Sequence, residues 1–293
     1  MCCLKTGVKF VDKEFSLDII LTFTPYFTFN LFFVIINYMQ DPNLKFAIDY
    51  LLDVNNLDRT NAVYDFNTFR ALMNITMPSN LSADYYKAQD NVLQMSYKDK
   101  TIVDVEALVP IKRNLCIWKG DITLLKADAI VNACNSELLG CFQPLHSCID
   151  NAIHSFAGLE VRRDLMNVMK VQGHSEPNGR AKITKGYNLP AKYIIHTVGP
   201  IVNGRVTKAN ETDLCNCYKS SLELAEQNGL KNIVFCSIST GLYGYPIEKA
   251  AEVAVKSVCD YFCKTNSGIQ KVVFDVFKEA DYDIYHRIIT AAS

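Results

Sequence analysis

The chain has 293 residues, of which 49% are hydrophobic and 21% charged, so it can bury a sizeable core and is not an intrinsically disordered chain. Its 30 Lys and Arg residues nearly balance its 31 Asp and Glu residues, which excludes a general electrostatic attraction to nucleic acid. The 11 cysteines are odd in number and scattered through apolar segments, a pattern that favours reduced thiols and a cytoplasmic location over a disulfide framework.

Residues 1–40 form an apolar N-terminal extension in this interpretation. Within it, residues 19–40 carry no charge and are rich in Phe, Ile and Leu, a length that matches the ~20 apolar residues that cross a bilayer. Pro25, Asn30 and Asn37 and the weak charge asymmetry of the preceding residues argue against a span. Membrane anchoring therefore stays open beside two alternatives, a helix packed on the body and an extension that is not well folded.

Residues 41–108 are predicted to be a helical lead-in. Apolar residues follow helical spacing from Leu44 to Leu57, and a second short helix is expected from Phe66 to Met73, where Met77 and Pro78 follow.

From residue 109 to 293 the pattern changes to short apolar runs separated by amphipathic stretches. The apolar runs that we predict as buried strands are residues 115–118, 129–131, 193–198, 233–237 and 272–276. The stretches that we predict as helices are residues 149–169, 213–228 and 247–264, and the polar residues 172–185 are expected to form a surface loop. Alternating strands and helices predict an α/β domain with a mostly parallel sheet, whose functional residues belong at the carboxyl ends of the strands.

Two thiols and one imidazole fall within eight residues, at Cys141, His146 and Cys148. Cys and His are the ligands that zinc prefers, and three protein ligands leave a fourth position for water or substrate, as in catalytic zinc sites. The spacing alone is equally compatible with two ordinary buried thiols and an unrelated histidine. We expect one zinc ion per chain, bound by these three residues.

Four motifs occur in order along residues 109–293. They are Gly120-Asp121-Ile122-Thr123, Ala129-Ile130-Val131-Asn132-Ala133-Cys134-Asn135, Tyr193 to Pro200, and Ser237 to Gly244. With these motifs the sequence resembles the macrodomain family. The resemblance implies a three-layer α/β/α fold with a mixed, mostly parallel central sheet and a cleft for ADP-ribose.

The segment from Gly140 to His154, which contains the Cys and His residues, resembles the zinc-dependent macrodomains, mostly microbial protein-ADP-ribose hydrolases. Phe69 to Asn74, with Gln89-Asp90, resembles the helical segment that precedes the macrodomain in that subfamily, so the resemblance covers roughly residues 44–290. It implies a zinc-dependent hydrolase that removes ADP-ribose from mono-ADP-ribosylated proteins. An RNA- or nucleotide-metabolite-binding module of the same fold would need a basic groove with exposed aromatics, for which the sequence gives little evidence, so no specific nucleic-acid partner is expected. The alternative is a non-catalytic reader that binds ADP-ribose and uses the metal only to fix a loop.

The resemblance also assigns ligand contacts. Asp121 and Ile122 are expected at the adenine and Asn135 at the distal ribose, although the position of Asp121 and Asn135 after strands also suits turn formers. Two glycines between a strand and a helix let backbone N–H groups approach a pyrophosphate, but by themselves they suit an ordinary turn as well. Together with the other motifs, the resemblance implies a diphosphate loop at Ser239, Thr240, Gly241, Leu242, Tyr243 and Gly244.

Phe277 is our candidate for stacking on adenine, and Asp275 stands where relatives are expected to have Asn. In the implied mechanism Cys141, His146 and Cys148 hold zinc against the distal ribose, where the ion either binds a ribose hydroxyl or activates the attacking water. Asn135 holds the sugar. Asp150 either orients a ligand or assists as a base, or serves only as a helix cap.

Overall fold

The computed structural model describes residues 41–292, and from Pro42 onward the chain forms one compact unit. The apolar extension predicted at residues 1–40, with its membrane-anchor candidate, lies outside the described residues. Among the helices that are described, none combines the length and the apolar character that a membrane span requires.

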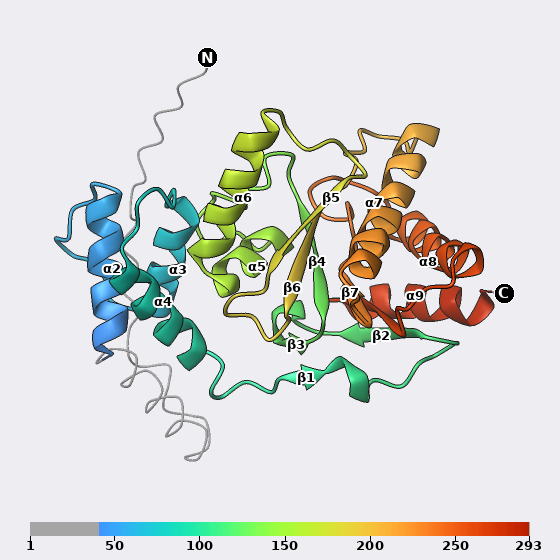
Figure 1. Ribbon diagram of the computed structural model, residues 1–293, viewed down its shortest axis with the longest axis horizontal. Coiled ribbons are helices and arrows are strands. Elements are labelled where there is room, and N and C mark those ends of the chain that lie inside the picture. The colour runs from blue at the N-terminus through green and yellow to red at the C-terminus, as the bar shows by residue number, and fades with distance from the viewer. Residues whose placement is uncertain (1–40, 293) are drawn as a thin grey trace, which may run out of the picture. The chain divides into compact units, whose positions relative to one another are not determined.

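A six-stranded sheet forms the centre of the fold (Figure 1). Its strands are β2 (Leu115–Lys119), β4 (Ala129–Cys134), β5 (Ala181–Lys185), β6 (Tyr193–Val198), β7 (Asn232–Phe235) and β8 (Lys271–Val276). They lie in the order β2-β8-β7-β4-β6-β5, and every pair is parallel except β5 on β6. The predicted mixed, mostly parallel sheet is therefore confirmed. A separate two-stranded ladder joins β1 (Val103–Asp104) to β3 (Leu125–Lys126).

The inner strands are almost entirely buried. All residues of β7 and β8 are buried, and Ala129, Ile130 and Val131 of β4 are 0% exposed. A strand that is covered on both faces is expected to be continuously apolar rather than alternating, which is why short apolar runs marked these strands in the sequence.

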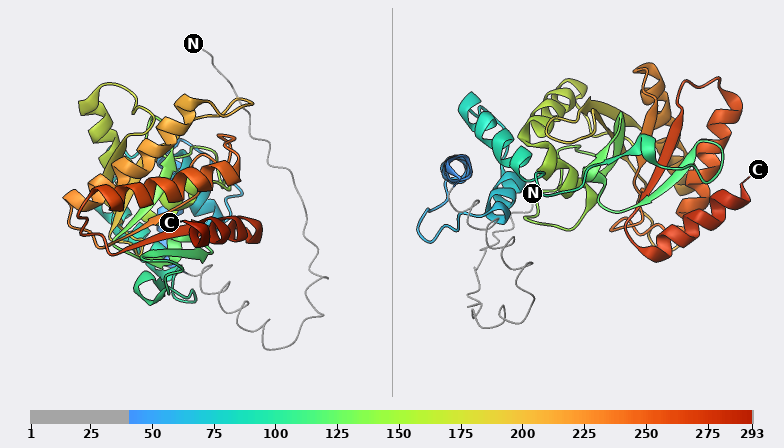
Figure 2. Two further views of the ribbon diagram at one scale, coloured as in Figure 1. Left: turned by 90° about the vertical axis from the view of Figure 1, so that its right-hand side faces the viewer. Right: turned by 90° about the horizontal axis from the view of Figure 1, so that it is seen from below.

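Helices cover both faces of this sheet. Helix α5 (Ile149–Ala157) packs on β4 and α6 (Leu159–Gln172) on β5, whereas α7 (Lys208–Gln227) packs on β5 and β6. Next to α7 lies α8 (Ile247–Lys264), followed by α9 (Glu279–Ala291), which contacts β2 and β8. The left view of Figure 2 shows α7, α8 and α9 as one layer in front of the strands. The predicted three-layer α/β/α arrangement is confirmed.

Within residues 41–292, three α-helices precede the sheet: α2 (Pro42–Val54), α3 (Phe66–Ile75) and α4 (Ala83–Met95). Side-chain caps define two of their starts, because Asp65 accepts a hydrogen bond from Thr68 N and Ser82 accepts one from Tyr85 N. Helix α2 packs on α3 and α4, and α3 packs on α5, so the lead-in helices contact the element that follows the Cys and His residues.

Three sequence predictions of structure were wrong or incomplete. The helix expected at 149–169 is broken at Gly158, which adopts φ +101° and separates α5 from α6. The loop expected at 172–185 contains β5, an edge strand in which Lys182 and Thr184 alternate with Ala181 and Ile183, so no apolar run marks it. Helix α4 lies within the helical lead-in predicted for residues 41–108 but was given no bounds of its own, and α9 was not predicted.

Candidate active site

The predicted ligand-binding residues meet at one edge of the sheet. Asp121 follows β2, Asn135 follows β4, the loop 239–244 follows β7 and Phe277 follows β8. Because these strands are parallel, their carboxyl ends lie at the same edge, the usual location of sites in α/β folds. Gly120 N donates to Val276 O at 3.0 Å, which brings Asp121 and Phe277 to neighbouring strand ends.

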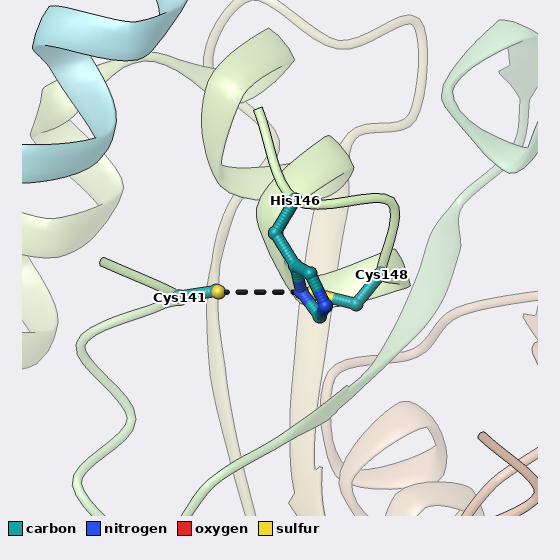
Figure 3. A group of neighbouring side chains, drawn as sticks. All are labelled: Cys141, His146 and Cys148. Carbon is teal, nitrogen blue, oxygen red and sulfur yellow. Dashed lines mark hydrogen bonds between the residues drawn. The ribbon is translucent and has the colours of Figure 1, made fainter. Parts of the chain in front are cut away.

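Cys141, His146 and Cys148 converge between β4 and α5, at the same edge. One donor atom from each residue can be chosen so that all three lie within 4.8 Å of one another. Figure 3 shows the three side chains pointing toward one another, with Cys141 Sγ 3.6 Å from His146 Nδ1. The structure therefore assembles the group of potential metal ligands that the sequence predicted.

The donor set and its spacing fit zinc. A tetrahedral zinc ion with Zn–S of about 2.3 Å and Zn–N of about 2.0 Å separates a sulfur ligand from a nitrogen ligand by about 3.5 Å. The separation between Cys141 Sγ and His146 Nδ1, 3.6 Å, is close to this value. Burial raises the pKa of the Cys148 thiol to about 12, so metal binding at neutral pH has to release a proton from this residue.

Local hydrogen bonds shape the loop that carries these ligands. His146 N donates to Gln143 O at 3.2 Å, and Asn151 Nδ2 donates to the same carbonyl at 2.9 Å. Cys148 is the N-cap of α5, where its Sγ accepts from Asn151 N at 3.4 Å. The second thiol thus lies at a helix N-terminus, where the hydrogen bond from Asn151 N lowers its pKa, an effect that burial outweighs.

Asp150 lies beneath the metal-binding loop in a buried polar network. It is 6% exposed, and its Oδ1 accepts from Asn132 Nδ2 at 2.8 Å and lies 3.4 Å from His154 Nε2. Burial raises the pKa of Asp150 to about 6 and lowers that of His196, which adjoins Asn132, to about 3. Burial lowers the pKa of both His154 and His196 and so keeps them neutral. Asn132 is therefore the strong donor to the Asp150 carboxylate.

Asp121 and Asn135 both form turns in the chain. Asp121 caps the short 3-10 turn η3 (Ile122–Leu124), where its Oδ1 accepts from the N–H and the hydroxyl of Thr123 at 3.0 and 2.7 Å. Asn135 accepts from Glu137 N at 3.0 Å and donates to Gly140 O at 3.1 Å. Each of these side chains retains hydrogen-bonding capacity, because a carboxylate and an amide have more acceptor and donor sites than these bonds use. The side chain of Ile122 is buried, at 2% exposure.

The loop 239–244 presents unpaired backbone donors. Within the described residues, the N–H groups of Gly241, Leu242 and Tyr243 donate to no carbonyl or side chain, and Leu242 is 83% exposed. Ser239 is buried with φ +66°, and Tyr245 N donates to its carbonyl at 3.0 Å, which closes the loop. Successive backbone N–H groups without an acceptor are the donors that a diphosphate can bind, so this loop stays the candidate for the predicted diphosphate loop.

The end of β8 places two predicted residues in opposite environments. Phe277 is 79% exposed, whereas Asp275 is 6% exposed and its Oδ1 has no hydrogen-bond partner in the described part of the chain. Burial raises the pKa of Asp275 well above its usual range, and the charge of Asp121 raises it further. Phe274 packs in the core against Phe235 and Tyr285, so Phe277 is the aromatic side chain at this strand end that is free to contact a ligand.

A hollow of about 620 Å³ opens at the opposite edge, among the amino ends of β4, β6, β7 and β8. Asp128, one of its acidic residues, already pairs with Lys192 at 2.7 Å and accepts from Lys231 N at 2.7 Å. We therefore assign the functional site to the carboxyl edge.

Sequence reasoning missed the residues that connect the lead-in to the site. Asn74 and Arg70 of α3 reach the loop 141–148 and α5, and Arg162 of α6 holds the end of α3. The signal available in the sequence is an arginine, Arg162, within a predicted helix. That signal does not reveal which groups the arginine contacts. Two half-buried cations, Arg70 and Lys100, also lie over the ring of Phe156, with guanidinium and ammonium groups 5.1 and 4.4 Å from its centroid.

Comparison with known proteins identifies the family of this chain. The Macro domain family profile matches residues 131–254. The macrodomain of Trypanosoma brucei in complex with ADP-ribose superimposes with a TM-score of 0.58 at 30% identity, covering 72% of this chain and 92% of that one. A relative from Treponema medium is 47% identical over 225 residues, which are 75% of this chain and 86% of the relative. The chain belongs to the macrodomain family.

Two relatives carry the same functional name. The Treponema medium protein is named protein-ADP-ribose hydrolase. So is a protein of Staphylococcus aureus strain MSSA476, which is 48% identical over 219 residues, 74% of this chain and 82% of the relative.

Proposed function

We propose that this chain is a zinc-dependent protein-ADP-ribose hydrolase that removes ADP-ribose from mono-ADP-ribosylated proteins. The observation that carries the proposal is the convergence of Cys141, His146 and Cys148 within 4.8 Å at the edge where the ligand-binding residues lie. Relatives named protein-ADP-ribose hydrolase at 47% and 48% identity support the hydrolase activity. The donor set of two thiols and one imidazole supports zinc.

In this proposal the chain binds ADP-ribose along the carboxyl edge. The free N–H groups of Gly241, Leu242 and Tyr243 bind the diphosphate, in the loop 239–244. Asp121 accepts a hydrogen bond from the adenine amino group beside the backbone of Ile122, and Phe277 stacks on the adenine ring. Together these contacts orient the distal ribose toward the metal-binding loop.

At the distal end, Asn135 holds the ribose through the donor and acceptor sites that its turn leaves free. Cys141, His146 and Cys148 hold the zinc ion, which when bound supplies a Lewis acid that polarises an oxygen at the scissile end. For Asp150 we favour an orienting role over that of a base, because its carboxylate is buried and accepts from Asn132 at 2.8 Å. It fixes the first turn of α5, directly after Cys148.

The test is release of ADP-ribose from a mono-ADP-ribosylated protein. Five samples are compared: the native protein, a chelated sample without added zinc, a chelated sample with added zinc, Cys141→Ala, and Cys263→Ala. Cys263 is an exposed free thiol, so its substitution serves as the matched control. We expect chelation and Cys141→Ala to lower the rate by about 100-fold or more, because Lewis-acid catalysis contributes several kcal/mol. Zinc should restore the chelated sample, and Cys263→Ala should behave as native.

Two outcomes contradict the proposal in different ways. Full activity in a sample shown to be free of metal means that the hydrolase does not use zinc. No release by the zinc-loaded native protein, with ADP-ribose binding intact, identifies a non-catalytic reader.

A further inference from the structure

We propose that Asn74, on helix α3 of the lead-in, is a positioning residue for the metal-binding loop. It fixes the backbone of residue 145 so that His146 faces Cys141 and Cys148. This inference rests on the metal site of the proposed function, and it extends that site to a helix about 70 residues earlier in the sequence.

The Asn74 amide joins α3 to both sides of the site. Asn74 is 1% exposed, its Oδ1 accepts from Leu145 N at 2.9 Å, and its Nδ2 donates to Ser155 Oγ of α5 at 2.9 Å. Leu145 precedes the ligand His146, and Ser155 belongs to the helix that Cys148 caps. One buried side chain therefore links the segments that carry two of the three ligands.

Leu145 has a conformation that needs support. Its φ is +54°, in the left-handed region that costs a residue other than glycine on the order of 1 kcal/mol. Its side chain is 44% exposed, so packing contributes little to holding it. The hydrogen bond to Asn74 is the contact that compensates for this strain at the position where the chain turns toward His146.

Helix α3 is itself fixed to the loop by Arg162. The guanidinium is buried, and its Nη1 donates to the carbonyls of Met73, Asn74 and Thr76 at 2.9, 3.0 and 2.7 Å. Its Nε donates to Leu139 O at 2.7 Å, two residues before Cys141. The end of α3 and the start of the metal-binding loop are thus held by one cation, so the Asn74 amide is presented at a fixed position.

A second residue on the same helix face contacts Asn151, the residue whose N–H caps the other thiol. Arg70 stands one turn before Asn74, and its Nη2 lies 3.5 Å from Asn151 Oδ1. The N–H of Asn151 donates to Cys148 Sγ at 3.4 Å. Helix α3 therefore supports the loop at Leu145 and, more weakly, at the cap of Cys148.

Groups that orient metal ligands typically change metal affinity by about 10- to 100-fold when they are removed. The test is cobalt(II) uptake by the full chain, because the ligand-field absorption of cobalt reports coordination geometry without any enzyme assay. Native protein, Asn74→Ala, Asn74→Asp and Ser155→Ala are titrated with cobalt(II), and zinc competition then gives relative affinities. Thermal unfolding of each variant reports its stability.

We expect Asn74→Ala to bind cobalt at least about tenfold more weakly, with an altered absorption spectrum. Asn74→Asp keeps an oxygen acceptor for Leu145 N and should give the native spectrum. Ser155→Ala is the matched control, because it removes the other partner of Asn74 and leaves the bond to Leu145 in place. Native affinity and spectrum in Asn74→Ala would overturn the role of Asn74 alone, whereas no cobalt uptake by the native protein overturns both this role and the metal site.

Hydrogen exchange on the native protein tests the inference if Asn74→Ala does not fold. The Leu145 amide should be protected before any metal is added, because Asn74 Oδ1 accepts its hydrogen. Exchange of this amide at the rate of an unprotected residue in the metal-free native protein overturns the proposal.

Discussion

Gly199, which follows β6, lies against Ser239 of the diphosphate loop with no room for a side chain. A Cβ on Gly199 would stand 2.1 Å from Ser239 Oγ and 2.8 Å from Ile238 Cγ2. Ser239 and Ile238 are both buried, so the glycine of the Tyr193 to Pro200 motif is explained by close contact with these two residues.

Gly199→Ala should therefore shift this loop. We expect a loss of unfolding free energy of about 1–3 kcal/mol, as in other overpacked sites, together with weaker ADP-ribose binding. Calorimetry measures both quantities. Gly268→Ala is the control, because a Cβ there meets only the ends of Glu226 and Lys231, at 3.2 and 3.4 Å. Native affinity in Gly199→Ala would show that the loop does not bind the ligand in its present conformation.

Asp121→Asn separates the two functions of this residue. Asparagine keeps an oxygen that caps Thr123, so the fold should be retained, but it removes the negative charge. A hydrogen bond to a charged acceptor is worth about 1.5–3 kcal/mol, against about 1 kcal/mol for a neutral one, so ADP-ribose affinity should fall by roughly tenfold. Isothermal titration with ADP-ribose measures this. An unchanged dissociation constant would mean that Asp121 is only a turn former.

Phe277→Ala tests the stacking contact. The ring is 79% exposed, so its removal should leave the melting temperature nearly unchanged. Stacking of a base on an aromatic side chain contributes about 1–3 kcal/mol, which predicts a loss of ADP-ribose affinity of about 10-fold or more. Val109→Ala, at 85% exposure and in another part of the surface, is the control. If both variants bind ADP-ribose as the native protein does, Phe277 does not contact adenine.

The buried carboxyl group of Asp275 should make the free energy of unfolding depend on pH. Its pKa in the folded chain is raised by burial and by Asp121, whereas in the unfolded chain it is about 3.9. A raised folded pKa means that the contribution of Asp275 to stability is fully present below about pH 4 and is lost as pH rises toward the folded pKa. Asp275→Asn removes this titration.

The stability of Asp275→Asn relative to the native protein should therefore increase with pH, by up to about 1.4 kcal/mol per pH unit above pH 4. Denaturant unfolding of both proteins at pH 4, 5.5 and 7 gives the difference directly. A difference that stays constant across this range would show that Asp275 titrates normally in the folded chain.

The sequence predicted those strands and helices whose pattern is local. Residues 193–198 and 247–264 were expected as a strand and a helix with the observed bounds, because an uninterrupted apolar run and an amphipathic stretch each define an element. The break at Gly158 was missed because glycine is tolerated within a helical pattern. Gln89 packs so closely against Gly158 that a Cβ on residue 158 would lie 2.5 Å from Gln89 Nε2. That contact comes from α4, and no local pattern contains it.

The same distinction applies to the site. Cys141, His146 and Cys148 could be found because all three lie on one short loop. Asn74 and Arg162 could not, because their partners lie 71 residues and more than 80 residues away in the sequence, and a single sequence carries no spacing signal over such distances. For Asp121 and Asn135 the turn-forming and ligand-binding interpretations were treated as alternatives, whereas the observed turns leave atoms free for a ligand.

The guanidinium of Arg162 has a consequence for shortened versions of this protein. A fragment cut to the boundaries of the family profile, residues 131–254, lacks the three α3 carbonyls that accept from Arg162 Nη1. It also lacks β2 and β8, and it leaves a buried cation without most of its acceptors. The smallest fragment in which Arg162 keeps these hydrogen bonds begins before Phe66. The lead-in is therefore part of the folding unit.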